Sequence, residues 1–224
     1  MKYFLSLAFS LYCFASFGQD CSGFYYMQNN KVIEMSFTNK KGKSAGKNVY
    51  SISNVTKAGG TTTATVSSEM FDQKGKSVSK AVNNMKCVNG TIMMDMKMFI
   101  PSAQQQQMGK TATAASDVYI DYPSNMKEGD ALKDGKFSMD FKTEAGMSGS
   151  VSIDITNRKV VGKETITTAA GTWECFKITY NSKINFKVLV GIPIKMEVTE
   201  WYAPGFGVVK SDSNGFIAEI TSVK

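Results

Sequence analysis

The sequence predicts a mainly β protein built on a single antiparallel curved sheet, a half-barrel or barrel of roughly eleven strands with at most one or two short helices. Three features predict this fold class. Apolar and polar residues alternate with period two over long stretches, turn signals recur about every 10 to 15 residues, and helical periodicity is scarce. Because long exposed strand edges promote aggregation, we expect the sheet to curve or close on itself.

The chain begins with a segment typical of exported proteins. Lys2 is followed by an uncharged apolar run over residues 3–17 that ends in small residues. This pattern is that of a secretory signal peptide, and the run is shorter than the ~20 apolar residues that span a bilayer. We therefore expect residues 1–18 to be a signal peptide and residues 19–224 to form a single β domain without a transmembrane anchor. Its expected location is the periplasm, the outer membrane or cell surface, or the medium.

Three cysteines remain once Cys13 is removed with the signal peptide: Cys21, Cys87 and Cys175. In an oxidising compartment an odd number is met most simply by one disulfide and one free thiol. Cys21 with Cys87 is the preferred pair, because it tethers the N-terminus and closes a loop of about 66 residues, which contributes about 4 kcal/mol in the chain-entropy model. Three buried, unpaired thiols are the alternative.

Short strands separated by turns are predicted along the first two thirds of the chain. They cover residues 31–38, 48–55, 63–71, 91–100, 117–122, 136–141, 150–157 and 159–168. The segments between them are rich in Gly, Lys and Asn, which is typical of hairpin connections. Asn157 and Arg158 are expected to turn the chain between the last two strands. Strands joined in this way form an antiparallel meander.

Residues 176–198 show the clearest alternation, with apolar side chains at even positions and polar side chains at most odd positions. Such alternation predicts strands with one face buried in the core and the other exposed to solvent. An ordinary strand has about 5 to 6 residues, so this stretch is expected to contain two or three strands. Breaks are predicted at residues 181–183 and at residues 190–193, where Pro193 lacks a backbone donor.

Residues 101–116 depart from the strand pattern and predict a short helix followed by a loop. This segment is either a solvent loop or a movable flap over one mouth of the sheet. Just before it, three methionines alternate along one face of the predicted strand at residues 91–100. A methionine lining suits a cavity for acyl chains or an apolar peptide, and it equally suits ordinary core packing. The candidate ligand-binding residues are Met94, Met96, Met98, Phe186 and Val188.

Charge and composition argue against several functions. The net charge is +7, but Arg158 is the one arginine and the lysines are scattered, so nucleic-acid binding is not expected. The chain has no histidine, which removes the usual catalytic base and the commonest zinc ligand. The acidic residues Glu128, Asp130 and Asp134 do not have the spacing of a calcium loop. We expect no cofactor, no metal and no enzymatic activity; an enzyme that uses carboxylates is the alternative.

Several segments resemble the TapB family of exported proteins from Gram-negative bacteria, which has no established activity. The matching segments are residues 21–26, 126–135, 157–180 and 200–211. Such domains are similar to the curved sheets of lipoprotein carriers of the LolA type, in which a half-barrel holds acyl chains beneath a small helical lid. This resemblance implies that the segment from Trp201 to Ser211 is a structural hairpin turned at Pro204 and Gly205.

These observations lead to one functional hypothesis and one alternative. The hypothesis is a noncatalytic exported envelope protein that shelters an apolar ligand, a lipid or lipopeptide, in its curved sheet. The alternative is an interaction or assembly module of the cell envelope with a solid core and no ligand, whose partner is another envelope protein.

Overall fold

The computed structural model describes residues 21–100, 104, 108, 118–143, 145–188, 191 and 193–224. The predicted signal peptide at residues 1–18 lies outside the described residues, as does nearly all of the predicted flap at residues 101–116. Within the described ranges, no helix has both the length and the apolar character needed to cross a membrane.

The described residues form twelve strands in one sheet, so the predicted fold class is confirmed. The first six strands are β1 (Val32–Thr38), β2 (Ser44–Ala58), β3 (Thr61–Phe71), β4 (Ser77–Val88), β5 (Thr91–Asp95) and β6 (Tyr119–Tyr122). The last six are β7 (Gly135–Lys142), β8 (Ser148–Thr168), β9 (Gly171–Lys187), β10 (Ile194–Ala203), β11 (Gly207–Ser213) and β12 (Phe216–Val223). Short 3-10 turns form η1 (Cys21–Gly23), η2 (Tyr25–Met27) and η3 (Met96–Phe99).

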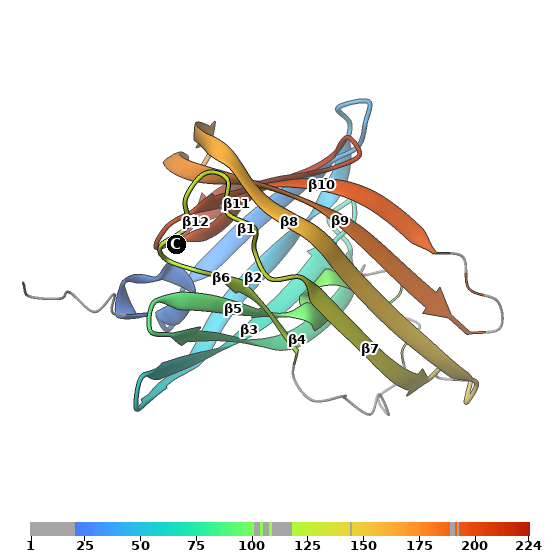
Figure 1. The fold of residues 1–224 in the computed structure, drawn as a ribbon. Coiled ribbons are helices and arrows are strands. Elements are labelled where there is room, and N and C mark those ends of the chain that lie inside the picture. Colours follow the sequence, from blue (N-terminus) through green and yellow to red (C-terminus); the bar gives the residue numbers. More distant parts are fainter. Residues whose placement is uncertain are drawn as a thin grey trace, which may run out of the picture.

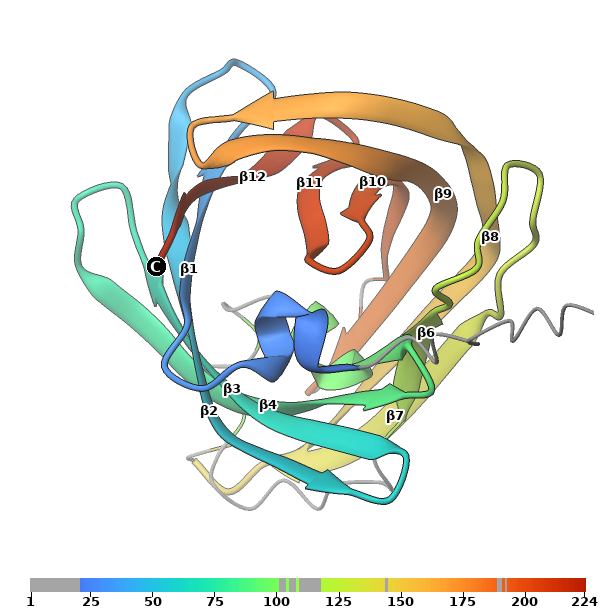
Figure 2. The same ribbon diagram turned by 90° about the vertical axis from the view of Figure 1, so that its left-hand side faces the viewer.

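The sheet consists of two antiparallel meanders joined at their first and last strands. Its order is β6-β5-β4-β3-β2-β1-β12-β11-β10-β9-β8-β7, so β1 lies beside β12 and the sheet ends at β6 and β7. The strands cross the molecule in Figure 1 and form a ring when viewed end-on in Figure 2, with the blue turns η1 and η2 inside the opening. The sheet is therefore a nearly closed barrel whose seam lies between β6 and β7.

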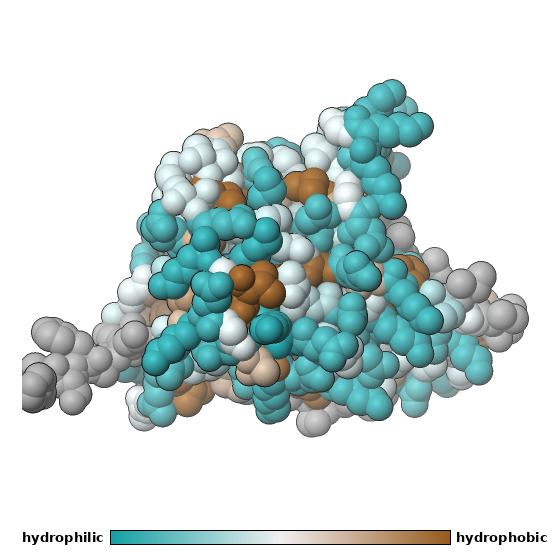
Figure 3. Space-filling view, turned by 45° about the horizontal axis from the view of Figure 1, so that its top comes forward, coloured by the Kyte–Doolittle hydropathy of each residue, from teal (hydrophilic) through white to brown (hydrophobic). Residues whose placement is uncertain are grey.

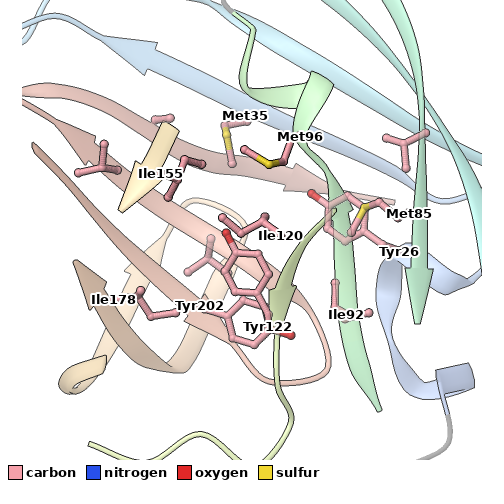
Figure 4. Close-up of a cluster of buried hydrophobic side chains, with 14 of the residues drawn as sticks. Tyr26, Met35, Met85, Ile92, Met96, Ile120, Tyr122, Ile155, Ile178 and Tyr202 are labelled. Carbon is pink, nitrogen blue, oxygen red and sulfur yellow. The ribbon is translucent and has the colours of Figure 1, made fainter. Parts of the chain in front are cut away.

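Alternate side chains of each strand fill the interior of this barrel. In β9, Phe176, Ile178, Tyr180 and Ile184 are buried, as the period-two pattern predicts. Ile194 departs from the pattern because it begins β10 at the rim, where 39% of its surface is exposed. Figure 4 shows part of the resulting core, in which side chains from η2, η3 and several strands pack together.

Two predicted turns are wrong because the strands continue through them. β9 runs without interruption across residues 181–183, where Ser182 points inward and pairs with Met196 of β10. Asn157 and Arg158 form a bulge in the long strand β8 instead of a turn. Asn157 has a φ of 58°, and Asn54 has a φ of 52° at the corresponding irregularity of β2. Bulges bend strands, and asparagine tolerates this left-handed backbone, so these two positions help to curve the sheet.

The boundaries differ at two further places. Strand β4 was not predicted, because inward Ser79 and Asn83 are polar while outward Val82 is apolar, although Met85 and Cys87 are fully buried. The strand predicted over residues 91–100 ends at Asp95, whose side chain accepts a hydrogen bond from the Lys97 amide at 2.9 Å. This cap begins η3, so the three methionines do not share one strand face. The predicted break before β10 is confirmed, since β9 ends at Lys187.

Candidate functional site

A cavity of about 380 Å³ lies inside the barrel and is called here the lumen cavity. Most strands contribute to it, together with η2 and η3. The apolar part of its wall includes Met35, Met70, Met94, Met98, Phe99 and Ile184. Its polar part includes Asn48, Asn83, Ser182 and Glu200. The cavity is therefore mainly apolar with a few convergent polar groups, which is the usual composition of a small-molecule site.

The N-terminal turns close one end of the barrel. A disulfide joins Cys21 of η1 to Cys87 of β4, in agreement with the predicted pairing, and both residues are buried. Tyr25 donates its backbone N–H to the carbonyl of Gly205 at 3.1 Å. At Gly207, with a φ of 132°, an added Cβ would lie 3.1 Å from the Tyr26 ring, so glycine permits this close approach. The turn between β10 and β11 thus holds η2 in place, with Tyr26 lining the lumen cavity.

Among the described residues, Glu200 of β10 is the one carboxylate that lines the lumen cavity, and it is 5% exposed. Tyr180 of β9 donates its hydroxyl to Oε1 at 2.6 Å, and Tyr122 of β6 donates to Oε2 at 2.8 Å. Burial raises the pKa of Glu200, while the Tyr180 hydrogen bond, the positive charge of Arg158 and the Tyr122 hydrogen bond limit the increase. Three strands thus meet at one buried carboxyl group.

Arg158 bridges the seam between β6 and β7. Its Nη1 donates to the carbonyl of Asp121 in β6 at 3.0 Å and to that of Lys133, just before β7, at 2.9 Å. Its guanidinium carbon lies 4.9 Å from the centre of the Tyr122 ring, which stacks on Tyr202 at 4.8 Å. The bulge of β8 therefore places the one arginine of the chain between the two sheet edges. There its side-chain hydrogen bonds connect β6 to the residues before β7, in place of backbone hydrogen bonds between paired strands.

Close packing completes the seam. A Cβ added at Gly135, the first residue of β7, would lie 3.0 Å from Sδ of Met96 and 3.1 Å from Cδ1 of Ile120. The glycine allows η3 and β6 to contact the start of β7 directly. Met96 is fully buried in this contact and takes part in the core shown in Figure 4.

The structure separates the five predicted ligand-binding residues. Met94 and Met98 line the lumen cavity, whereas Met96 packs at the seam. Phe186 stacks on Phe141 at 5.0 Å, and Val188 lines a different depression beside β7 and β8. Two of the five residues therefore line the lumen cavity, and the other three lie outside its lining.

Sequence reasoning missed Glu200 as a lining residue. The signal was present, since Met196, Val198 and Glu200 continue the even-numbered inward pattern to a charged residue. A carboxylate at an inward position of an otherwise apolar strand requires buried partners. The sequence gives no indication that Tyr122, 78 positions away, supplies one of them.

The other chemical candidates remain structural. Asp130 accepts a hydrogen bond from the Lys127 amide at 2.7 Å in an exposed turn. No group of acidic or cysteine side chains in the described ranges is arranged to hold a metal ion. Cys175 is an unpaired, buried thiol, and burial raises its pKa to about 12.

The outer surface contrasts with the interior. On the face shown in Figure 3, hydrophobic residues form small separate patches between hydrophilic ones. The exposed large apolar side chains among the described residues are Val82, Met147, Val161, Ile194 and Phe216. They belong to different strands and turns of the described chain, namely β4, β8, β10, β12 and the turn between β7 and β8.

Comparisons with known proteins agree with this fold. A "putative exported protein with YmcC-like fold" from Bacteroides fragilis is 23% identical, with a TM-score of 0.70 over 88% of this chain and 96% of that chain. A "putative lipoprotein" from Parabacteroides distasonis is 19% identical, with a TM-score of 0.72 over 90% of this chain and 98% of that chain. Both likenesses show the fold alone. A search of curated proteins found no match.

The family follows from the sequence itself. These comparisons give no particular support for the TapB family or for lipoprotein carriers. The family model that does match covers residues 28–216, which is most of the chain and includes β1 to β11. The chain belongs to the DUF3108-like family.

Proposed function

We propose that this protein is a noncatalytic exported envelope protein that holds an apolar ligand, a lipid or lipopeptide, inside its barrel. The observation that carries the proposal is the lumen cavity of about 380 Å³, which falls within the ~300–1,000 Å³ of small-molecule sites. Methionine side chains in its wall adapt to chains of different shape. The exported or lipoprotein descriptions of both similar structures support an envelope location.

The noncatalytic assignment rests on the polar groups of the wall. Glu200 is its one carboxylate among the described residues, and both of its oxygens accept tyrosine hydrogen bonds. Glycoside hydrolysis by carboxylates, for example, uses two such groups in one site. The described wall therefore suits binding better than bond cleavage.

The proposed entrance is the end of the barrel opposite η1 and η2. Phe37, near the end of β1, and Phe216, at the start of β12, stack at 5.8 Å and both line the cavity. Phe216 is 40% exposed although it is a large apolar residue. An aromatic pair with one exposed ring at the rim of an apolar cavity provides a first contact for an acyl chain.

The test is ligand retention by a matched pair of variants. Ser68 lines the lumen cavity, whereas Ser67 on the same strand points outward. Ser68→Phe fills part of the cavity, and Ser67→Phe adds the same ring outside it. Native mass spectrometry of gently purified protein should find bound lipid in the wild type and in Ser67→Phe, and much less in Ser68→Phe. Equal retention by both variants, or ligand-free wild type after lipid exposure, would contradict the proposal.

A protein-interaction module is the second candidate, and the edge strand β7 favours it. β7 pairs with β8 on one side, while among the described residues its other side has no strand partner. Unpaired strand edges accept strands from other chains. A reproducible envelope protein partner captured equally by wild type and Ser68→Phe, without lipid, would support this function over ligand binding.

A further inference from the structure

The lumen cavity has a charge character opposite to that of the whole chain. The chain carries +7, yet the described residues that line the cavity include Glu200 and neither lysine nor arginine. Arg158 lies over the ring of Tyr122, and its Nη1 hydrogen bonds go to two backbone carbonyls at the seam. A ligand against the described wall therefore meets a carboxyl group without meeting a cationic side chain.

Two residues of this wall offer acceptors with unused hydrogen-bonding capacity, Glu200 and Asn48. Each oxygen of Glu200 accepts one tyrosine hydroxyl, and a carboxylate oxygen has room for a second donor. Asn48 also lines the cavity, and its buried Oδ1 has no hydrogen-bond partner. Buried acceptors without partners are costly, so a ligand that brings donors is favoured over one that brings more acceptors.

Aromatic rings add a second attraction for positive charge. Tyr26, Tyr50, Phe99 and Tyr180 line the same cavity as Glu200. Burial raises the pKa of Tyr26 and of Tyr50, so both phenols stay neutral at neutral pH. The faces of neutral aromatic rings attract cations, most strongly where water is excluded.

We propose that the lumen cavity binds amphiphiles whose inner end is an ammonium group, that is, long-chain aliphatic amines, and that it discriminates against carboxylate ends. This inference rests on the proposed function, because it names the class of ligand that the same cavity accepts. An ammonium group brings three donors and a positive charge to Glu200 and Asn48. A carboxylate end would instead lie against Glu200, and the described part of the wall offers it no cation.

The experiment compares decylamine, decanol and decanoate by isothermal titration calorimetry at neutral pH, below their micellar concentrations. These probes share one chain and differ in the head group. We expect decylamine to bind at least about 10-fold more tightly than decanoate, as buried charge pairing allows. Non-specific attraction to the cationic surface would favour decanoate, so it cannot produce this order.

Two glutamate variants on β10 locate the effect. Glu200→Gln removes the charge from the lumen cavity and should reduce the preference for decylamine to less than about 3-fold, since the charge pair supplies it. Glu197→Gln makes the same change at an exposed position of the same strand and should leave the preference unchanged. A preference for decylamine that survives Glu200→Gln would overturn the inference.

The outcomes separate the inference from the proposed function. Failure of all three probes to bind counts against the proposed function and so removes the inference with it. Binding of decanol and decanoate with no preference for decylamine keeps the proposed function and overturns the inference alone. If circular dichroism shows that Glu200→Gln does not fold, Tyr180→Phe is used, because it keeps the carboxyl group and frees Oε1. That variant should retain or increase the preference, and loss of the preference would overturn the inference.

Discussion

Replacing Arg158 by methionine should strongly destabilise the barrel, because this residue connects the two edges of the sheet. Its side chain is 2% exposed, so solvent screens its interactions little. Arg158→Met removes the hydrogen bonds to the carbonyls of Asp121 and Lys133 while keeping most of the side-chain volume. It also removes the positive charge that lowers the pKa of Glu200.

The expected loss follows from these contacts. Each hydrogen bond from a charged donor is worth about 1.5–3 kcal/mol, and buried Arg158 donates two of them to backbone carbonyls. The methionine leaves both carbonyls without this donor, so we expect the free energy of unfolding to fall by about 3–5 kcal/mol. In a Glu200→Gln background the carboxylate charge is absent, and Arg158→Met should cost about 1–2 kcal/mol less.

Urea denaturation followed by tryptophan fluorescence measures both quantities. Lys159→Met, at the exposed neighbouring position, is the matched control and should change stability by less than about 0.5 kcal/mol. Arg158→Lys keeps the charge but not the planar fork, so its loss should be intermediate. A loss below about 1 kcal/mol for Arg158→Met, or no coupling to Glu200→Gln, would refute the argument that this network closes the seam.

Two further predictions concern pH and the disulfide. Burial raises the pKa of Glu200, so the folded state holds its proton to higher pH than the unfolded state does. The free energy of unfolding should therefore fall as pH rises from the ordinary glutamate pKa through the raised one. Urea denaturation at each pH measures this fall, which should be absent in Glu200→Gln. Equal pH profiles for the wild type and Glu200→Gln would contradict the prediction. Replacing Cys21 and Cys87 with serine removes the disulfide, which joins residues with a sequence separation of 66. The free energy of unfolding should fall by about 4 kcal/mol. A loss below about 1 kcal/mol would contradict the argument that this disulfide stabilises the fold.

The strand pattern was the most accessible part of the fold. Period-two alternation is a local property, since each strand must present one face to the core whichever strands lie beside it. It therefore predicted the inward face of β9 and the mainly β architecture before any pairing was known. Where inward residues are polar, as at Asn83 and Ser79 of β4, the same criterion failed.

Turns and bulges have similar sequence patterns, and pairing with the neighbouring strand decides which of the two forms. Asn157 adopts the positive φ that the sequence suggests, but β8 continues because β9 pairs with it on both sides of the bulge. In the same way Asp95 caps η3 at a place where alternation alone predicted a continuing strand. Because η3 begins there, Met96 packs at the seam and not in the cavity, where the sequence placed it.

The sequence by itself determined the class of fold, the dry face of most strands and the preferred cysteine pair, because these depend on residue spacing and chain length. Only the tertiary structure placed Arg158 against β6 and brought Tyr122 and Tyr180 to Glu200. These contacts join strands that are far apart in the chain and become neighbours when the sheet curves into a barrel. The polar centre of the cavity is therefore a consequence of closure, and no local pattern contains it.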